Sequence, residues 1–145
     1  MVTYFSLEVD MSKLLPWLKV EMAPVNIETL EEGHIPEKPG VYLMLSDRTE
    51  YVYPWSDING NSQVYYIGRS TNLRTRLKTH KRYCLQRRAD RDRGHYWPYY
   101  EYATHHGCNV VWIISTNPKD IEHELLDAFA NYYGAKPVAN GQSAW

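Results

Sequence analysis

The sequence predicts one small domain of the α/β class, in which helices and strands are mixed in the α+β manner. Its 145 residues are the size of one domain, and with 43% hydrophobic residues the chain can bury a core. Three short apolar runs, at 41–45, 63–67 and 110–114, have the length and the residue types of strands. Two longer segments, at about 72–88 and after residue 117, repeat apolar residues at helical spacing.

We divide the chain into an N-terminal extension, residues 1–37, and a domain, residues 38–145. The extension holds a short amphipathic element around residues 14–18, which Pro16 interrupts, and it then becomes acidic. Its acidic stretch contains four glutamates: Glu28, Glu31, Glu32 and Glu37. We expect the extension to pack on the domain or to mediate specificity or dimerisation.

The first two strands are expected to form an antiparallel hairpin with a long loop. Residues 46–61 between them are polar and contain Pro54 and the pair Asn59-Gly60, which is a strong turn signal between strands. The loop also carries three aromatic residues that either contact a ligand or pack on the surface: Tyr51, Tyr53 and Trp55.

The segment after the second strand is the most strongly charged part of the chain. The strand run stops at Gly68, and Ser70, Thr71 or Asn72 can cap the helix that follows. Residues 66–93 contain ten of the sixteen Lys and Arg residues and only two aspartates, a net charge of +8, so the rest of this chain of net charge −1 carries −9. Because the basic segment follows two tyrosines directly, we favour a polyanion site over a solvated helix face.

Two polar residues lie on the side of this helix that we expect to face the sheet. Arg76 and His80 are four residues apart, so they project from one face, beside the apolar residues of the helix. An arginine there needs a partner, because a buried charge is costly unless it is paired. A salt bridge and a satisfied core histidine would explain each residue singly. Together with two tyrosines they suit phosphodiester chemistry, which must hold an anion and move a proton.

The other basic residues of the helix are predicted to bind nucleic acid. We expect Arg74, Lys78 and Lys81 to point away from the sheet, toward solvent or a phosphate. The full set of predicted contacts is Arg74, Lys78, Lys81, Arg82, Arg87 and Arg88. Residues 89–108 then interleave aromatic and basic residues, which can stack on exposed bases or pack within the protein.

The last helix is expected to start after Asn117, a good cap, with Pro118 in its first turn. Glu122 falls in the middle of its apolar stripe, whereas Glu124 lies outside it. A glutamate on the inward face of a helix is unusual. We therefore expect Glu122 to pair with Arg76 or another cation, or to bind a metal.

Composition argues against several classes of protein. No run of about 18 apolar residues exists, so we expect no membrane span. Cys84 and Cys108 are too few for a disulfide framework and are a weak zinc signal. Because no charged N-terminal region is followed by an apolar stretch, we expect no signal peptide and a reducing, cytoplasmic setting.

Taken in order, these residues resemble the GIY-YIG nuclease superfamily. The first signature strand appears as Gly40-Val41-Tyr42 and the second as Tyr66-Ile67-Gly68. Arg76, ten residues after Tyr66, matches the arginine of the family, and His80 matches the histidine of many members.

The resemblance continues to the end of the chain and covers about residues 38–140. The run Ile121-Glu122-His123-Glu124-Leu125-Leu126 fits the pattern around the family's metal-binding glutamate, with Glu124 as an alternative to Glu122. Pro137-Val138-Ala139-Asn140 looks like the closing element. The 24 residues that separate Tyr42 from Tyr66 are more like the restriction-endonuclease branch than the repair or homing branches.

The resemblance implies a central three-stranded antiparallel sheet flanked by helices, and metal-dependent hydrolysis of phosphodiester bonds that leaves 5′-phosphate and 3′-hydroxyl ends. The catalytic set would be Tyr42, Tyr66, Arg76, His80 and Glu122, supported by Arg69 and Asn140. Glu122 would hold Mg²⁺, with Mn²⁺ able to substitute, and Arg76 would contact the phosphate. Tyr42 or Tyr66 would position or deprotonate the attacking water, and His80 would relay a proton or bond to a tyrosine; the identity of the base stays open.

The expected partner is DNA, double-stranded in preference to single-stranded, and a homodimer that cuts both strands is compatible with the chain length. Three other functions stay open. One is a nuclease specific for single strands or for DNA structure. The second is a catalytically silent nucleic-acid-binding module on the same scaffold, and the third is a protein-interaction domain whose aromatic residues form the binding surface.

Overall fold

The computed structural model describes residues 22–53, 61–89, 102–103 and 105–140, with the side chains of residues 61 and 86–89 excepted. Several features singled out in the sequence lie outside these residues. They are the element around 14–18, Trp55, the Asn59-Gly60 pair, most of the aromatic segment 89–108, and the side chains of Arg87 and Arg88.

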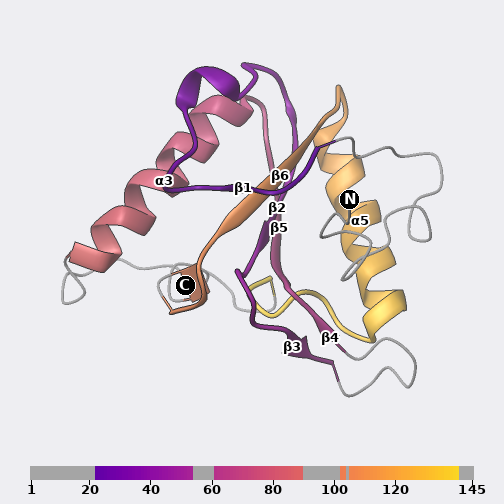
Figure 1. Ribbon diagram of the computed structural model, residues 1–145. Helices are drawn as coiled ribbons and strands as arrows, with labels where there is room; N and C mark the ends of the chain where they lie inside the picture. The colour runs from indigo at the N-terminus through magenta and orange to yellow at the C-terminus, as the bar shows by residue number, and fades with distance from the viewer. Residues whose placement is uncertain (1–21, 54–60, 90–101, 104, 141–145) are drawn as a thin grey trace.

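A four-stranded antiparallel sheet forms the centre of the molecule, with one long helix on each face (Figure 1). The strands, in spatial order, are β1 (Val25–Asn26), β6 (Asn109–Ile114), β2 (Gly40–Leu45) and β5 (Val64–Ser70). The helices are α3 (Leu73–Ala89) and α5 (Pro118–Tyr133). A 3₁₀ turn, η1 (Glu32–His34), and a small ribbon of β3 (Tyr51–Val52) and β4 (Asn61–Ser62) complete the fold. The predicted α+β class is confirmed.

Strand β2 shows why the sheet is covered on both sides. All six of its residues are buried, so the strand reads as a continuous apolar run instead of alternating with polar residues. Val41, Leu43 and Leu45 belong to the core that includes Leu125 and Phe129 of α5. The residues between them, Tyr42 and Met44, belong to the second core, with Leu73 and Leu77 of α3. Tyr42 is therefore directed toward α3 by strand alternation alone.

The strands and helices predicted from the sequence are confirmed, with two differences in the main sheet, and the segment predicted as a long loop also contains the β3–β4 ribbon. The sheet has four strands and not three, because Val25 and Asn26 pair with Val110 and Asn109 in a strand too short to show a pattern. The second strand does not stop at Gly68: it continues to Ser70, because the backbone of β5 stays paired with Gly40 and Val41 of β2.

Residues 27–38 pack against α3 and complete its first turn. Ile27, Leu30 and Ile35 are buried in the core on the α3 side of the sheet. The backbone N–H groups of Leu73 and Arg74, which have no partner within the helix, donate to the carbonyls of Lys38 and Pro36. The next N–H, of Thr75, donates to the Asn72 side chain, so Asn72 is the capping residue among the three candidates.

The loop between β2 and β5 also contributes to the core. Tyr53 is buried with Phe129 and Tyr133 of α5, and its hydroxyl accepts a hydrogen bond from the Val138 N–H at 3.1 Å. Of the two open interpretations of this tyrosine, the structure favours packing over ligand contact.

Within the residues that the structure describes, no helix is long and apolar enough to cross a membrane.

Candidate active site

Tyr42 stands at the centre of a buried group of polar side chains on the α3 side of the sheet. Its hydroxyl lies 2.8 Å from Nε2 of His80 and accepts a hydrogen bond from Nε of Arg76 at 3.3 Å. Tyr42 is 1% exposed and His80 is fully buried. Arg76 and His80 occupy successive turns of α3, and the prediction that they project together toward the sheet is confirmed.

The glycines of the two signature strands are required by close packing. Gly68 lies directly opposite Tyr42 in the sheet, and a Cβ atom there would come within 2.5 Å of the Tyr42 hydroxyl and 2.8 Å of the Tyr66 ring. A Cβ atom at Gly40 would overlap the Ile113 carbonyl oxygen and lie 2.7 Å from Leu73. Gly68 therefore makes room for the tyrosine pair, and Gly40 lets α3 approach the sheet.

Tyr66, on the edge strand β5, is the more accessible of the two tyrosines. Its ring centroid is 6.2 Å from that of Tyr42 and 6.5 Å from that of His80. Burial raises the pKa of Tyr66 above its ordinary value, and the charge of Arg76 and hydrogen bonds to Tyr42 and Arg76 oppose that shift. Arg76 lowers the pKa of Tyr66, as expected from the sequence, but burial raises it by more. The Tyr66 phenol is therefore protonated at neutral pH.

His80 is neutral in this environment. Burial, and secondarily the charge of Arg76, hold the pKa of His80 well below its ordinary value. A neutral imidazole can accept the hydroxyl proton of Tyr42 at Nε2, or donate to the hydroxyl oxygen, according to its tautomer. Of the two roles expected for His80, hydrogen bonding to a tyrosine is the one seen in this geometry.

Glu122 reaches the site from α5 on the other face of the sheet, past the edge strand. Its Oε1 lies 2.9 Å from Nη1 of Arg69, and the two side chains are 15% and 42% exposed. The prediction that Glu122 pairs with a cation is confirmed, with Arg69 as the partner in this ion pair. Glu124 is exposed, so the structure brings Glu122 and not Glu124 to the site. The charge of Glu122 also acts on the pKa of Tyr66, which it raises.

Asn140 holds the edge of β5 in place. Its side-chain amide donates to the Ile67 carbonyl at 2.8 Å and accepts from the Ile67 N–H at 2.9 Å, while the Ala139 N–H donates to the Tyr65 carbonyl. An edge strand exposes backbone groups that need such partners. Asn140 thus supports the strand segment between Tyr66 and Gly68 from the side.

A family model for the T5orf172 domain matches residues 50–144. The chain belongs to the T5orf172 domain family. This family is GIY-YIG-like and nuclease-related, and it is associated with endonuclease-like function and with nucleic acid as the partner. The match includes Tyr66, Arg76, His80, Glu122 and Asn140 and begins after Tyr42. No curated protein and no solved structure gave a significant match.

The basic helix of this T5orf172 protein does not present the cations as the sequence predicted. Arg74 donates from Nε to the Ile35 carbonyl at 2.8 Å and forms an ion pair with Glu37. Lys78 lies 3.4 Å from a carboxylate oxygen of Glu32, and Lys81 donates to the Leu30 carbonyl at 2.6 Å. These three residues contact residues 30–37, so the acidic stretch of the extension supplies partners along this flank of α3, although Lys78 itself stays exposed to solvent as predicted.

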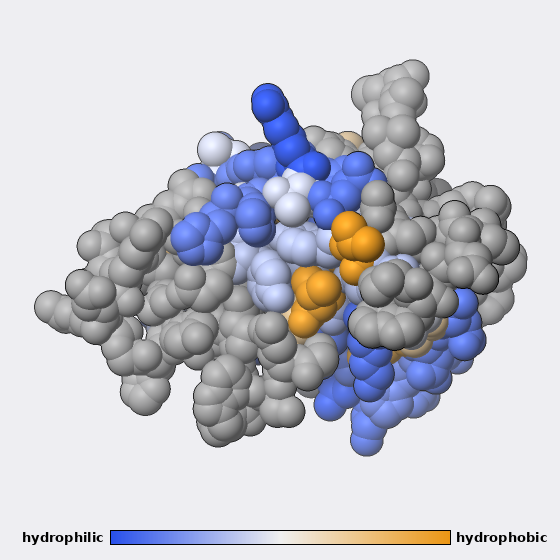
Figure 2. Space-filling view, turned by 90° about the horizontal axis from the view of Figure 1, so that it is seen from below, coloured by the Kyte–Doolittle hydropathy of each residue, from blue (hydrophilic) through white to orange (hydrophobic). Residues whose placement is uncertain are grey.

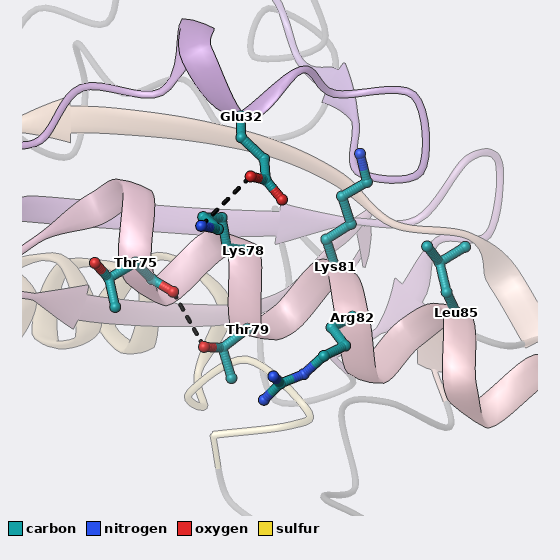
Figure 3. Close-up of a pocket in the computed structure, with 7 residues that line it drawn as sticks. All are labelled: Glu32, Thr75, Lys78, Thr79, Lys81, Arg82 and Leu85. Atoms are coloured by element: carbon teal, nitrogen blue, oxygen red, sulfur yellow. Dashed lines mark hydrogen bonds and ion pairs between the residues drawn. The ribbon is translucent and has the colours of Figure 1, made fainter.

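A surface groove of about 480 Å³ runs along the same flank (Figure 3). Glu32 and Lys78 face each other across it, and Thr79 bonds to the Thr75 carbonyl on its floor. Arg82 lines the same groove, is exposed, and its guanidinium lies 5.0 Å from the ring centroid of Tyr83. Among the predicted nucleic-acid contacts with described side chains, Lys78 and Arg82 are exposed, and of these two Lys78 forms an ion pair with a described residue whereas Arg82 does not.

Hydrophilic residues cover most of the described surface on the face seen from below, with hydrophobic residues in small spots (Figure 2). The described residues of that face form no broad apolar patch of the kind that a protein-interaction domain presents. They therefore give no support to the protein-interaction alternative.

Glu122 is the carboxylate that the structure brings to the site, and it could hold a divalent cation. No group of three or more His, Cys, Asp or Glu residues that could hold an ion exists among residues 22–53, 61–89, 102–103 and 105–140. A zinc or calcium cage would need such a group. Mg²⁺ is different, because it is held by one or two carboxylates and takes its remaining ligands from water and substrate phosphate. The donor set of this T5orf172 protein therefore fits Mg²⁺.

Proposed function

We propose that this T5orf172 protein is a metal-dependent endonuclease of the GIY-YIG type, which hydrolyses phosphodiester bonds of DNA and leaves 5′-phosphate and 3′-hydroxyl ends. The observation that carries the proposal is the convergence of Tyr42, Tyr66, Arg76, His80 and Glu122. These residues come from two strands and two helices on opposite faces of the sheet. Packing alone does not require two phenols, a guanidinium, an imidazole and a carboxylate at one sheet edge.

Arg76 binds the scissile phosphate in this proposal. Its Nε holds the Tyr42 hydroxyl, which fixes the guanidinium in place before substrate arrives. The guanidinium is always charged and offers further N–H donors, so it offsets the negative charge that grows on the phosphate oxygens in the transition state. Glu122 would hold Mg²⁺ or Mn²⁺, and the bound ion supplies Lewis-acid polarisation of the phosphate.

The attacking water loses its proton along a short chain of hydrogen bonds. Tyr66, the more accessible phenol, positions the water, and its hydrogen bond to Tyr42 continues to Nε2 of His80. A proton taken up by Tyr66 displaces one to Tyr42 and then one to His80, which ends as imidazolium, while the P–O3′ bond breaks and the departing 3′-oxygen takes a proton from water to become the 3′-hydroxyl. In the protein without substrate, the positive charge of Arg76 disfavours the imidazolium form and lowers the pKa of His80. A phosphate bound to Arg76 offsets its charge, so the pKa of His80 rises when substrate is present.

The test is cleavage of supercoiled plasmid and of labelled single-stranded DNA with Mg²⁺, with Mn²⁺ and with EDTA. We compare Glu122→Gln with Glu124→Gln, which makes the same change at an exposed position two residues away. We expect the wild type and Glu124→Gln to cut with either metal, and Glu122→Gln to lose at least about a hundredfold in rate. Equal activity of the two variants would refute the role of Glu122.

The same assay also distinguishes a site-specific nuclease from a strand- or structure-specific one. Discrete linear fragments indicate a site-specific enzyme that cuts double-stranded DNA, and linear product without a nicked intermediate indicates a homodimer that cuts both strands at once. Degradation of the single strand alone indicates a strand- or structure-specific nuclease. Binding without cutting in any metal would replace the nuclease by the silent binding module.

A further inference from the structure

A second hollow lies beside the candidate active site, and the topology of the sheet explains it. Strands β5 and β6 are both antiparallel to β2, which lies between them, so they end at the same end of the sheet. The turns that follow them therefore lie close together. Between these turns is a pocket of about 640 Å³, bounded by residues 69–71 on one side and 116–120 on the other.

The lining of this pocket is polar and carries more positive than negative charge. Arg69 and Lys119 supply two cations against the single carboxylate of Asp120. Thr71 adds a hydroxyl, and Asn117 adds a side-chain amide that makes no capping hydrogen bond to α5. From the sequence we expected the Asn117 side chain to cap α5. Because it makes no capping hydrogen bond, its amide lies in the pocket wall instead. Cations, hydroxyls and amides are the groups that contact phosphate and sugar oxygens in protein–DNA interfaces.

The pocket and the candidate active site share a wall. Arg69 lines the pocket and is joined to Glu122 through the 2.9 Å ion pair. Lys119 and Glu122 are three residues apart on α5, which places them on adjacent turns of one face. A strand whose phosphate sits between Arg76 and Glu122 therefore meets this pocket next along its length.

We propose that the pocket binds the phosphodiester next to the scissile one on the same strand, with Lys119 as its main contact. The inference rests on the proposed function and makes the substrate more specific: a polynucleotide that continues beyond the cut, and not a free nucleotide. Lys119 is exposed and takes part in no ion pair with the described residues, so its charge is available to a phosphate, whereas Arg69 is shared with Glu122.

The test compares Lys119→Ala with Lys136→Ala, which removes an exposed lysine just beyond the other end of α5. We expect Lys119→Ala to lower kcat/KM on DNA about fivefold or more, and to reduce the slope of log affinity against log salt by about 0.9, the value for one phosphate contact. Lys136→Ala should stay within twofold of wild type, and Lys119→Arg should restore the salt slope. Indistinguishable alanine variants would overturn the proposal.

A second measurement locates the contact on the substrate. After the cut is mapped with wild-type protein, single neutral methylphosphonates replace phosphates at successive positions around it. Wild type should lose activity when the neighbouring phosphate is neutral, and Lys119→Ala should lose nothing further at that position, because the two changes remove one contact. Additive losses at every position would overturn the assignment.

The experiment distinguishes the two proposals if the protein does not cut. In that case the same pair of variants is compared by binding of a duplex oligonucleotide over a salt series. A smaller slope for Lys119→Ala than for Lys136→Ala supports the phosphate pocket while the nuclease proposal fails. Equal slopes, or a wild type that neither binds nor cuts, overturn the pocket as well.

Discussion

At the scale of single residues, Gly68 is the position where the site is most tightly packed. A Cβ atom there would lie 2.5 Å from the Tyr42 hydroxyl and 2.6 Å from the ring carbon that carries it. We predict that Gly68→Ala lowers the free energy of unfolding by about 1–3 kcal/mol, the range for an overpacked core, and displaces Tyr42 from His80 and Arg76. Urea denaturation measures the first effect and DNA cleavage the second.

Gly33 provides the matched control for that prediction. A Cβ atom at Gly33 would meet nothing within 4 Å, so Gly33→Ala should change stability by no more than a few tenths of a kcal/mol and leave cleavage intact. If Gly68→Ala and Gly33→Ala are equally stable and equally active, the close approach of Tyr42 to β5 does not constrain residue 68.

His80 gives the protein a pH dependence of known sign. The pKa of His80 is lowered in the folded state by burial and by Arg76, whereas the unfolded chain takes up a proton near pH 6.5. The unfolded state therefore binds more protons below that pH, so stability is complete above about pH 6.5 and is lost as the pH falls toward the folded pKa. We predict a slope of up to about 1.4 kcal/mol per pH unit from this residue.

Two variants isolate the contribution of His80 to that slope. His80→Gln keeps a polar partner for Tyr42 but does not titrate, so its stability should depend less on pH between 4 and 6.5 than that of wild type. His123→Gln makes the same change at an exposed histidine of α5 and serves as the matched control. Parallel curves for all three proteins would show that His80 does not titrate differently on unfolding.

At the scale of elements, the stability of β5 depends on a side chain far away in sequence. Asn140 satisfies both the N–H and the carbonyl of Ile67 on the open edge of this strand. We predict that Asn140→Leu destabilises the protein by about 1–3 kcal/mol, because two buried backbone groups lose their partners. The Ile67 amide should also exchange with solvent faster, which hydrogen exchange measures. Asn131→Leu, at an exposed position of α5, should leave both unchanged.

The sequence was sufficient for the elements that have a clear period. The hairpin and the third strand follow from short apolar runs between turn signals, the direction of Arg76 and His80 follows from helical spacing, and the structure confirms them. β1 could not be found, because two residues are too few to show a period. The continuation of β5 beyond Gly68 was missed as well. The strand continues through this glycine because Arg69 and Ser70 pair with Val41 and Gly40 of β2, and the missing Cβ atom leaves room for the Tyr42 ring.

The sequence could not predict which residues pair with the charged side chains of the site. That Glu122 needs a cation follows from its place in an apolar stripe, but the choice of Arg69 depends on how far β5 extends. Asn117 does precede α5 as predicted and its carbonyl accepts the Ile121 N–H, but its side chain makes no capping hydrogen bond and lines the pocket at the end of the sheet instead. Local sequence patterns determine which face of a helix or strand a residue occupies. The ion pairs and hydrogen bonds of its side chain depend on elements that are distant in sequence.

At the scale of the whole molecule, the acidic stretch of the extension contacts the basic helix α3. The basic segment carries +8 and the rest of the chain −9, and the structure places acidic residues 32 and 37 against Lys78 and Arg74 of α3. The excess of glutamate in the extension is the feature of the sequence that could have indicated this contact. Part of the basic charge is therefore neutralised within the protein and is not available to DNA.

This neutralisation predicts a weaker salt dependence of DNA binding than the net charge of the basic segment suggests. A lysine already paired with a carboxylate adds little to the release of counterions from DNA, so Lys78→Gln should leave the slope of log affinity against log salt nearly unchanged. Arg82 lines the same groove and is exposed, but it forms no ion pair with a described residue, so Arg82→Gln should reduce the slope by about 0.9 if DNA runs along this helix. Both variants remove one positive charge, so a difference between them reports pairing and not net charge. Equal reductions would show that DNA displaces Glu32 from Lys78, and no reduction in either variant would place the DNA path away from this groove.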